Sequence, residues 1–213
     1  MQATRIKMCG ITRPEDARFA VESGADAIGL VFYPKSKRYV SPAQAQALLR
    51  DIPPFVASVG LFVDAEAKEV EATLAQVPLS LLQFHGDESS SFCASFSLPY
   101  MKAFRVGKDA DLLEQVKTHA AAEYILLDAF DSKAPGGTGK TFDWNLAKQV
   151  NSLPRVRCIL AGGLDDSNVS TAISEVDPYG VDVSSGVEKT PGIKDPLLIK
   201  KFIEGVRSVS SRD

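Results

Sequence analysis

Residues 126–144, LLDAFDSKAPGGTGKTFDW, show how this chain is organised. They begin inside an apolar run, residues 124–127, that is typical of a strand buried on both faces. Asp128 stands at the end of that strand, and a loop with three glycines and a proline follows it. Asp143 can then cap a helix that begins at Trp144. This succession predicts an α/β fold, in which a carboxylate at a strand end is a candidate acid or base.

The same loop contains Gly139-Lys140-Thr141, which looks like the end of a nucleotide-binding P-loop. That motif needs a glycine five residues before Gly139, and Ala134 stands there instead. We therefore expect the loop to be a lid over a small substrate and not a nucleotide site.

Strand-like and helix-like segments alternate along the whole chain, with no linker between them. Such alternation predicts a parallel sheet, and eight units in 213 residues predict a closed (β/α)8 TIM barrel. We expect one catalytic domain over residues 1–213. The expected strands are residues 5–11, 27–32, 57–63, 81–85, 100–106, 124–128, 158–161 and 180–183.

Polar residues and prolines mark where the intervening helices should begin. Thr12, with Glu15 three residues later, matches a capping box for a helix that stops at Gly24. Ser41 and Pro42 should start the second helix. The other expected helices are residues 65–75 after a cap at Asp64, a helix from about residue 88, residues 109–121, the helix from residue 144, residues 167–175 after a cap at Asp166, and a last helix from residues 195–196 that fades after residue 208.

The composition argues against several classes of protein. A net charge of −3 gives no electrostatic footprint for nucleic acid, and no apolar run approaches the ~18 residues of a membrane span. The N-terminus has no signal-peptide pattern. The three cysteines, Cys9, Cys93 and Cys158, are odd in number and form no CxxC pair. We expect a cytoplasmic protein with neither disulfide nor zinc, and with no nucleic-acid or membrane partner.

The carboxyl ends of the strands of such a barrel meet on one face, where active sites form. Cys9 ends the first strand there. A buried cysteine usually behaves as a small hydrophobe, but a thiol at this rim can act as a base once it loses its proton. Lys7 lies on the same strand face and would point into the barrel, where an unpaired charge is costly. We predict that it pairs with Asp182 on the adjacent eighth strand; the alternative is that Lys7 points outward beneath a helix.

Two glycine-containing clusters follow the seventh and eighth strands. Loops at this corner of a barrel commonly bind phosphate through backbone N–H groups and a helix N-terminus, although glycines also serve tight turns. We expect a phosphate group of the substrate here. The residues concerned are Gly162, Gly163, Ser184, Ser185 and Gly186.

Two further side chains are candidates for binding substrate. Arg38 lies in a basic loop with Lys35 and Lys37; such loops are usually solvated, but at the catalytic face an arginine fork suits a carboxylate. His85 ends the fourth strand at the rim, and we expect it to contact substrate, although a lone histidine is more often structural. Because His119 is the only other histidine, no metal cluster is credible, and we expect no metal and no cofactor.

These motifs, in this order, resemble the phosphoribosylanthranilate isomerase family of tryptophan biosynthesis. Each is weak alone, but together they are specific and span nearly the whole chain. One departure is Phe84, where leucine is more usual. The matching segments are KMCGIT (7–12), GLVFYPKSKRY (29–39), QFHGD (83–87), LD (127–128), GGTGKTFDW (136–144), AGGL (161–164) and VDVSSGVE (181–188).

The resemblance implies an enzyme without a cofactor that performs an Amadori rearrangement. It would convert N-(5′-phosphoribosyl)anthranilate to 1-(2-carboxyphenylamino)-1-deoxyribulose 5-phosphate. It implies that Asp128 is the general acid, that Cys9 is the general base, and that Arg38 faces the anthranilate carboxylate, with the phosphate in the two glycine clusters. The short polar C-terminal tail offers no obvious interface, so we expect a monomer whose partner is a small phosphorylated substrate.

Three alternatives remain open at this point. The histidine-pathway aminoaldose isomerase uses a pair of aspartates, whereas the first strand here ends in Cys9. Indole-glycerol-phosphate synthase would need lysines and glutamates around the rim that we do not find. A non-catalytic phosphosugar-binding barrel would not need Cys9 and Asp128, and full function in a Cys9→Ala variant would favour it.

Overall fold

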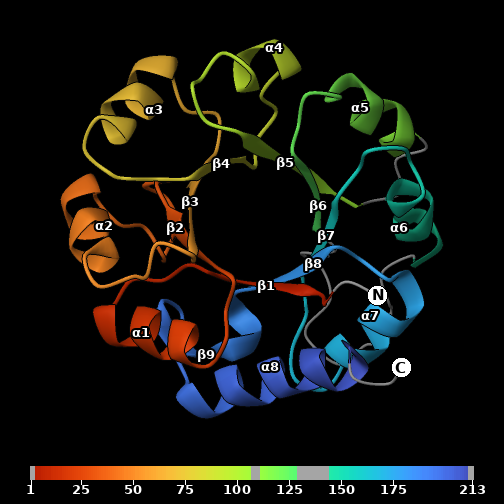
Figure 1. Cartoon of the computed structure of the whole chain (residues 1–213). Coiled ribbons are helices and arrows are strands. Elements are labelled where there is room, and N and C mark those ends of the chain that lie inside the picture. Colours follow the sequence, from red (N-terminus) through yellow and green to blue (C-terminus); the bar gives the residue numbers. More distant parts are fainter. Residues whose placement is uncertain (1–2, 107–110, 129–143, 211–213) are drawn as a thin grey trace.

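The computed structural model describes residues 3–106, 111–128 and 144–210, which form a closed barrel of eight parallel strands inside a ring of helices (Figure 1). The strands pair in chain order, and β1 pairs with β8 to close the barrel. The expected (β/α)8 barrel is therefore confirmed. Its strands are β1 (Arg5–Cys9), β2 (Ala27–Val31), β3 (Ala57–Phe62), β4 (Leu81–Phe84), β5 (Tyr100–Arg105), β6 (Tyr124–Asp128), β7 (Cys158–Ala161) and β8 (Gly180–Val183).

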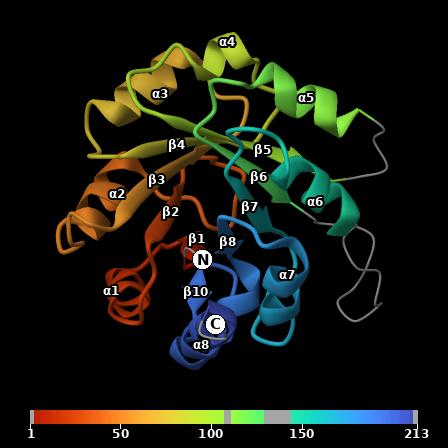
Figure 2. The same cartoon turned by 45° about the vertical axis from the view of Figure 1, so that its right-hand side comes forward.

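One helix follows each strand and packs on the outside of the barrel (Figures 1 and 2). Within the described residues, no helix is long and apolar enough to cross a membrane. The helices are α1 (Pro14–Glu22), α2 (Pro42–Leu49), α3 (Ala67–Leu74), α4 (Ser90–Cys93), α5 (Leu112–Thr118), α6 (Trp144–Asn151), α7 (Val169–Val176) and α8 (Pro196–Ser210).

The alternation of side chains along each strand divides the core into two parts. Outward-facing residues such as Leu82 and Phe84 join the large cluster beneath the helices. Inward-facing residues such as Leu81, Met101 and Leu126 fill the barrel itself. The positions above this inner layer face the carboxyl end of the barrel, so their side chains decide the chemistry there.

The first strand ends at Cys9 and not at residue 11 as expected. Gly10 has a φ of +73° and turns the chain out of the sheet, because the N–H groups of Gly10 and Ile11 both donate to the carbonyl of Gly29. Strands β2 to β5 likewise end one residue earlier than expected, whereas β6, β7 and β8 have the expected bounds.

The helix caps expected at Thr12 and Asp64 are wrong. Helix α1 follows Arg13, and the hydroxyl of Thr12 donates instead to the carbonyl of Gly192. Asp64 has a φ of +47° and accepts a hydrogen bond from the N–H of Asp87, so α3 begins three residues later. In both cases a partner distant in sequence takes the polar side chain away from the local helix.

The cap expected at Asp166 is also wrong, because its neighbour Asp165 accepts from the N–H groups of Ser167 and Asn168. The start of α2 is confirmed, since the Ser41 hydroxyl accepts from the N–H of Gln44 in a capping box. The proposed lid, the helix start at residue 109 and the cap at residue 143 lie outside the described residues.

A short hairpin between β8 and α8 was not expected. After the 3-10 turn η1 (Ser185–Val187), strands β9 (Glu188–Thr190) and β10 (Ile193–Lys194) pair antiparallel. Gly192, with a φ of +84°, lies in their connection. The hairpin brings Glu188 and Lys194 back to the rim of the barrel.

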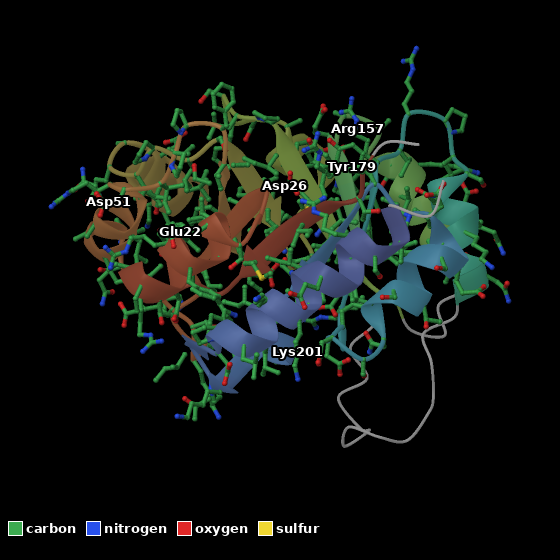
Figure 3. The ribbon with its side chains drawn as sticks, turned by 60° about the horizontal axis from the view of Figure 1, so that its bottom comes forward. Glu22, Asp26, Asp51, Arg157, Tyr179 and Lys201 are labelled. Carbon is green, nitrogen blue, oxygen red and sulfur yellow. The ribbon has the colours of Figure 1, made fainter. Side chains whose placement is uncertain are left out.

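The amino end of the barrel carries a different set of side chains. Arg5 forms an ion pair with Asp26 at 2.8 Å, and the Arg157 guanidinium lies over the rings of Tyr124 and Tyr179. Figure 3 shows Asp26, Arg157 and Tyr179 near one another at this end, where β2, β7 and β8 begin. These contacts connect the strands at the amino end of the barrel, whereas the candidate site residues lie at its carboxyl end.

Candidate active site

A cavity of about 630 Å³ opens at the carboxyl ends of the strands. Its walls come from segments far apart in the sequence, because the barrel brings every strand end to one face. Eight of the nine residues predicted from the sequence line it. They are Cys9, Arg38, His85, Asp128, Gly162, Gly163, Ser184 and Ser185.

Lys7 lies below Cys9 on β1 and points into the barrel as predicted. Its Nζ is 3.0 Å from Oδ1 of Asp182, and both side chains are buried. The Lys7 ammonium also lowers the pKa of the Cys9 thiol. Gly29 on β2 leaves room for both side chains, because a Cβ there would lie 2.9 Å from the sulfur and 3.0 Å from Nζ. The predicted Lys7–Asp182 ion pair is therefore confirmed, and it lies near the candidate base.

The charged groups around Cys9 shift the pKa of its thiol in opposite directions. Burial raises the pKa of the Cys9 thiol, and the carboxylate of Asp182 raises it further. The ammonium groups of Lys7 and Lys194 lower it, and the net pKa stays above the ordinary value. The thiol form is therefore favoured until another positive charge approaches the sulfur.

Arg38 is held at the rim by Glu188 of the hairpin. Its Nε and Nη2 donate to the two carboxylate oxygens at 2.8 and 2.6 Å. Burial alone would raise the pKa of Glu188, but the hydrogen bonds from Arg38 and Lys194 hold it below its usual value. Arg38 Nη1 has no hydrogen-bond partner in the part of the chain that the structure describes, so it is the nitrogen available to a ligand.

Lys194 connects the β9–β10 hairpin to the ends of β1 and β8. Its buried Nζ donates to the carbonyls of Cys9 and Ser184 at 2.6 and 3.0 Å, and to Glu188 at 3.0 Å. Burial lowers the pKa of this ammonium, and Glu188 partly offsets that effect. The ends of β1 and β8 are thus fixed to the carboxylate that holds Arg38.

Asp128 lies at the end of β6 and contacts His85, which follows β4. His85 Nε2 is 3.1 Å from Oδ2 of Asp128, and Gln83 Nε2 is 3.0 Å from His85 Nδ1. Strand β5 lies between these two strands, and Arg105 at its end is in register with Asp128 and lines the same cavity.

The two glycine clusters meet at one side of the cavity. Gly162 and Gly163 have φ values of +80° and +65°, which a side chain would strain. The hydroxyl oxygen of Ser184 is buried and has no hydrogen-bond partner among the described residues. Gly186 lies behind this wall in η1, where a Cβ would collide with the carbonyl of Leu164. These features suit an anion held by backbone N–H groups and a hydroxyl.

A second buried ion pair lies behind His85. Lys102 Nζ is 3.0 Å from Glu88, and both side chains are less than 5% exposed. Lys102 also donates to the carbonyl of Gly86, while Glu88 accepts from the N–H groups of Gly86 and Asp64. The pair therefore anchors the segment that follows His85.

Sequence reasoning missed the groups that hold the predicted residues in place. Only the spacing of two residues between Gln83 and His85, which puts both on one strand face, could have indicated that contact. Glu188 and Lys194 lie on strands of three and two residues, too short to leave a pattern. In the described residues, no three histidine, cysteine or acidic side chains are grouped as metal ligands would be.

This fold and this rim define a (β/α)8-barrel enzyme equipped for acid–base chemistry on a small anionic substrate. Residues 6–205 match the family described as N-(5′-phosphoribosyl)anthranilate (PRA) isomerase. The N-(5′-phosphoribosyl)anthranilate isomerase of Pseudomonas fluorescens (strain SBW25) is 52% identical over 210 residues, which cover 99% of each protein. The chain therefore belongs to the N-(5′-phosphoribosyl)anthranilate isomerase family.

Solved structures support the same assignment. The phosphoribosyl anthranilate isomerase from Thermotoga maritima superposes with a TM-score of 0.87 at 44% identity, covering 96% of this chain and 99% of that one. A second structure of such an isomerase, at 42% identity and a TM-score of 0.85, covers the same shares of both chains. That enzyme was crystallised with reduced 1-(o-carboxyphenylamino)-1-deoxyribulose 5-phosphate.

Proposed function

We propose that the chain performs the Amadori rearrangement of N-(5′-phosphoribosyl)anthranilate in tryptophan biosynthesis, with Asp128 as general acid and Cys9 as general base. The observation that carries this proposal is that both groups face one cavity, from β6 and from β1. The ligand of the crystallised relative has a carboxylate at one end and a phosphate at the other. Arg38 and the glycine clusters offer a site for each.

The first step opens the ribose ring. Asp128 gives its proton to the ring oxygen as the C1′–O bond breaks, and the nitrogen lone pair forms an iminium at C1′. Asp128 is left as a carboxylate, and its contact with His85 then stabilises the new charge.

The second step removes a proton from carbon. The iminium acidifies the C2′ proton, and its positive charge also favours the thiolate of Cys9, which forms when the thiol releases its proton to solvent. The thiolate takes the C2′ proton, and the electrons of that C–H bond form the C1′=C2′ double bond and neutralise the nitrogen. Transfer of a proton from the C2′ hydroxyl to C1′ then gives the ketone. Acid and base each contribute roughly 10²–10⁴-fold to such a reaction.

The two ends of the substrate fix its position between these groups. Arg38 Nη1 faces the anthranilate carboxylate, while Glu188 keeps the guanidinium in place. The phosphate lies against Gly162, Gly163 and Ser184. Because both ends of the substrate are bound, the reacting carbons are held in position between the two groups. Such positioning can supply a large part of the rate acceleration of an enzyme.

The test is turnover of freshly generated phosphoribosylanthranilate, followed by its loss of fluorescence. Wild type should consume it rapidly, whereas Cys9→Ala should show only background hydrolysis. Cys158→Ala is the matched control, because Cys158 is also buried but lies on β7 away from the cavity. It should retain turnover.

Other outcomes would redirect the proposal. No decay with wild type would exclude this substrate, and the histidine-pathway aminoaldose would be tested next. Full turnover in Cys9→Ala would remove the base assignment. A monomeric state, a single domain over residues 1–213 and a cytoplasmic location remain predictions, and sedimentation of the purified protein would check the first.

A further inference from the structure

Gln83, His85 and Asp128 form a hydrogen-bonded chain across the inside of the barrel. Gln83 is fully buried on β4, and His85 follows it on the same inward face. These hydrogen bonds run from β4 across β5 to Asp128 on β6. The three strands are neighbours in the ring (Figure 1). No step of the proposed reaction assigns a role to Gln83.

The chemistry of the Gln83 amide decides which atoms donate and which accept in this series of hydrogen bonds. The Gln83 nitrogen, 3.0 Å from His85 Nδ1, can only donate a hydrogen bond. Nδ1 must therefore accept, and a neutral imidazole then carries its proton on Nε2. Nε2 consequently donates to Oδ2 of Asp128, 3.1 Å away.

The opposite direction would affect the acid. If the amide oxygen faced Nδ1, the imidazole proton would lie on Nδ1, and Nε2 would accept. A protonated Asp128 could then donate its proton to His85 and not to the substrate. The orientation of the amide rests on the hydrogen bond of its nitrogen to His85, since the buried Gln83 oxygen has no hydrogen-bond partner among the described residues.

We propose that Gln83 is a positioning residue that holds His85 as the Nε2–H tautomer and so reserves the proton of Asp128 for the substrate. This inference rests on the proposed role of Asp128 as the acid. His85 then donates to Asp128 both before and after the proton transfer, and its donation strengthens as the carboxylate forms. A wrong histidine tautomer costs about 10⁴-fold in kcat in a serine protease, which shows how much such a contact can control.

The direct test is nitrogen NMR of the ¹⁵N-labelled protein. The chain has only two histidines, and a His85→Asn variant assigns the signals of each. We expect His85 to show a protonated Nε2 and an unprotonated Nδ1 at neutral pH. A protonated Nδ1 as the main form would overturn the proposal.

Variants of Gln83 connect the tautomer to the rate. Gln83→Glu offers Nδ1 only an acceptor, so the proton should move to Nδ1. We expect kcat to fall at least about tenfold while KM stays within about twofold. Gln83→Met keeps the shape without the donor, so both tautomers should appear, with a smaller loss of kcat. Gln76→Met is the control, because the Gln76 amide donates only to a carbonyl on the surface of α3; it should change neither spectrum nor rate.

The outcomes separate this inference from the proposed function. A wild-type rate in both Gln83→Glu and Gln83→Met would overturn the inference and leave the acid assignment intact. Normal turnover in Asp128→Asn would remove the acid assignment, while the tautomer of His85 would still be read independently. If Gln83→Glu does not fold, the wild-type spectrum and Gln83→Met decide the matter.

Discussion

The two sides of the catalytic rim use different electrostatics. On the side of β1 and β8, Cys9 is surrounded by charged groups, with the ammonium groups of Lys7 and Lys194 beside it. Across the ring, on β4 to β6, Asp128 contacts an imidazole that an amide holds in place (Figure 1). The buried cation of that side, Lys102, is paired with Glu88, and Arg105 at the end of β5 is exposed.

This difference follows from the change of charge that the proposed base, Cys9, and the proposed acid, Asp128, must each undergo. A base that starts as a thiol must turn into an anion, and nearby ammonium groups stabilise that anion. An acid must start neutral, and a cation in contact with it would release its proton too early. Among the described residues, the rim therefore places buried charges around the proposed base, and the amide of Gln83 and the imidazole of His85 on the side of the proposed acid.

The largest effect should come from Asp128→Asn. The amide cannot supply the proton for ring opening, so we expect kcat to fall by roughly 10²–10⁴-fold. Because the carboxylate and phosphate sites stay in place, a product analogue should bind nearly as well as to wild type. Stopped-flow rates and a calorimetric titration measure the two quantities. Near-normal turnover would show that the acid lies elsewhere.

The variant Lys7→Met tests whether the ammonium of Lys7 helps Cys9 to lose its proton. Lys7 lowers the pKa of the Cys9 thiol, so its removal raises that pKa and moves the rising limb of the pH–rate profile to higher pH. At neutral pH the rate falls about tenfold for each unit of that shift, and raising the pH should recover part of it. A lower rate with an unshifted profile would contradict the electrostatic role.

The ion pair also affects folding, which requires a control. Lys7→Met leaves Asp182 unpaired in the barrel and should cost about 3–5 kcal/mol of unfolding free energy. The double variant Lys7→Met/Asp182→Leu removes both charges and should recover most of that stability. Because Asp182 raises the pKa of the Cys9 thiol, the double variant should also recover part of the pH shift. A profile between those of Lys7→Met and wild type, with stability restored, would assign the loss of rate to the missing ammonium and not to misfolding.

Arg38→Ala should produce the next largest effect, and mainly in KM. A hydrogen bond between charged groups contributes about 1.5–3 kcal/mol to binding, so its loss should raise KM about tenfold or more. Glu188→Gln weakens the hold on Arg38 without removing it, so its KM should rise less. An unchanged KM in Arg38→Ala would remove its role in binding the carboxylate.

The sequence predicted the barrel because the strand pattern repeats eight times and small errors at strand ends do not change the topology. It predicted the Lys7–Asp182 pair for a physical reason, since a lysine on an inward face needs a partner on an adjacent strand. Eight of the nine predicted site residues line the cavity, because most of them follow strand ends, and their roles stay predictions.

The sequence could not decide between competing partners for one polar side chain. Thr12 is a good cap by local rules, but Gly192, far away in the sequence, takes its hydroxyl. Glu188 and Lys194 depend on a hairpin too short to leave a pattern, and they determine how Arg38 is held. The contact of His85 with Asp128 crosses β5, so it depends on the pairing of three strands, which local sequence does not reveal.

The smallest effect on activity should come from Lys102→Met, which removes the buried cation of the acid side. Lys102 contacts Glu88 and the carbonyl of Gly86, but not Asp128. Unfolding in urea should show a loss of about 3 kcal/mol, near the lower end for a broken buried pair, because Glu88 keeps its two backbone donors.

The histidine spectrum provides a second readout of the same variant. Burial lowers the pKa of His119, and Lys102 lowers it further, so Lys102→Met should raise that pKa towards its ordinary value. The tautomer of His85 should stay unchanged, since Gln83 still donates to it. If kcat instead fell as far as in Asp128→Asn, with His85 unaltered, a charge would be serving the acid directly, and the contrast between the two sides of the rim would be wrong.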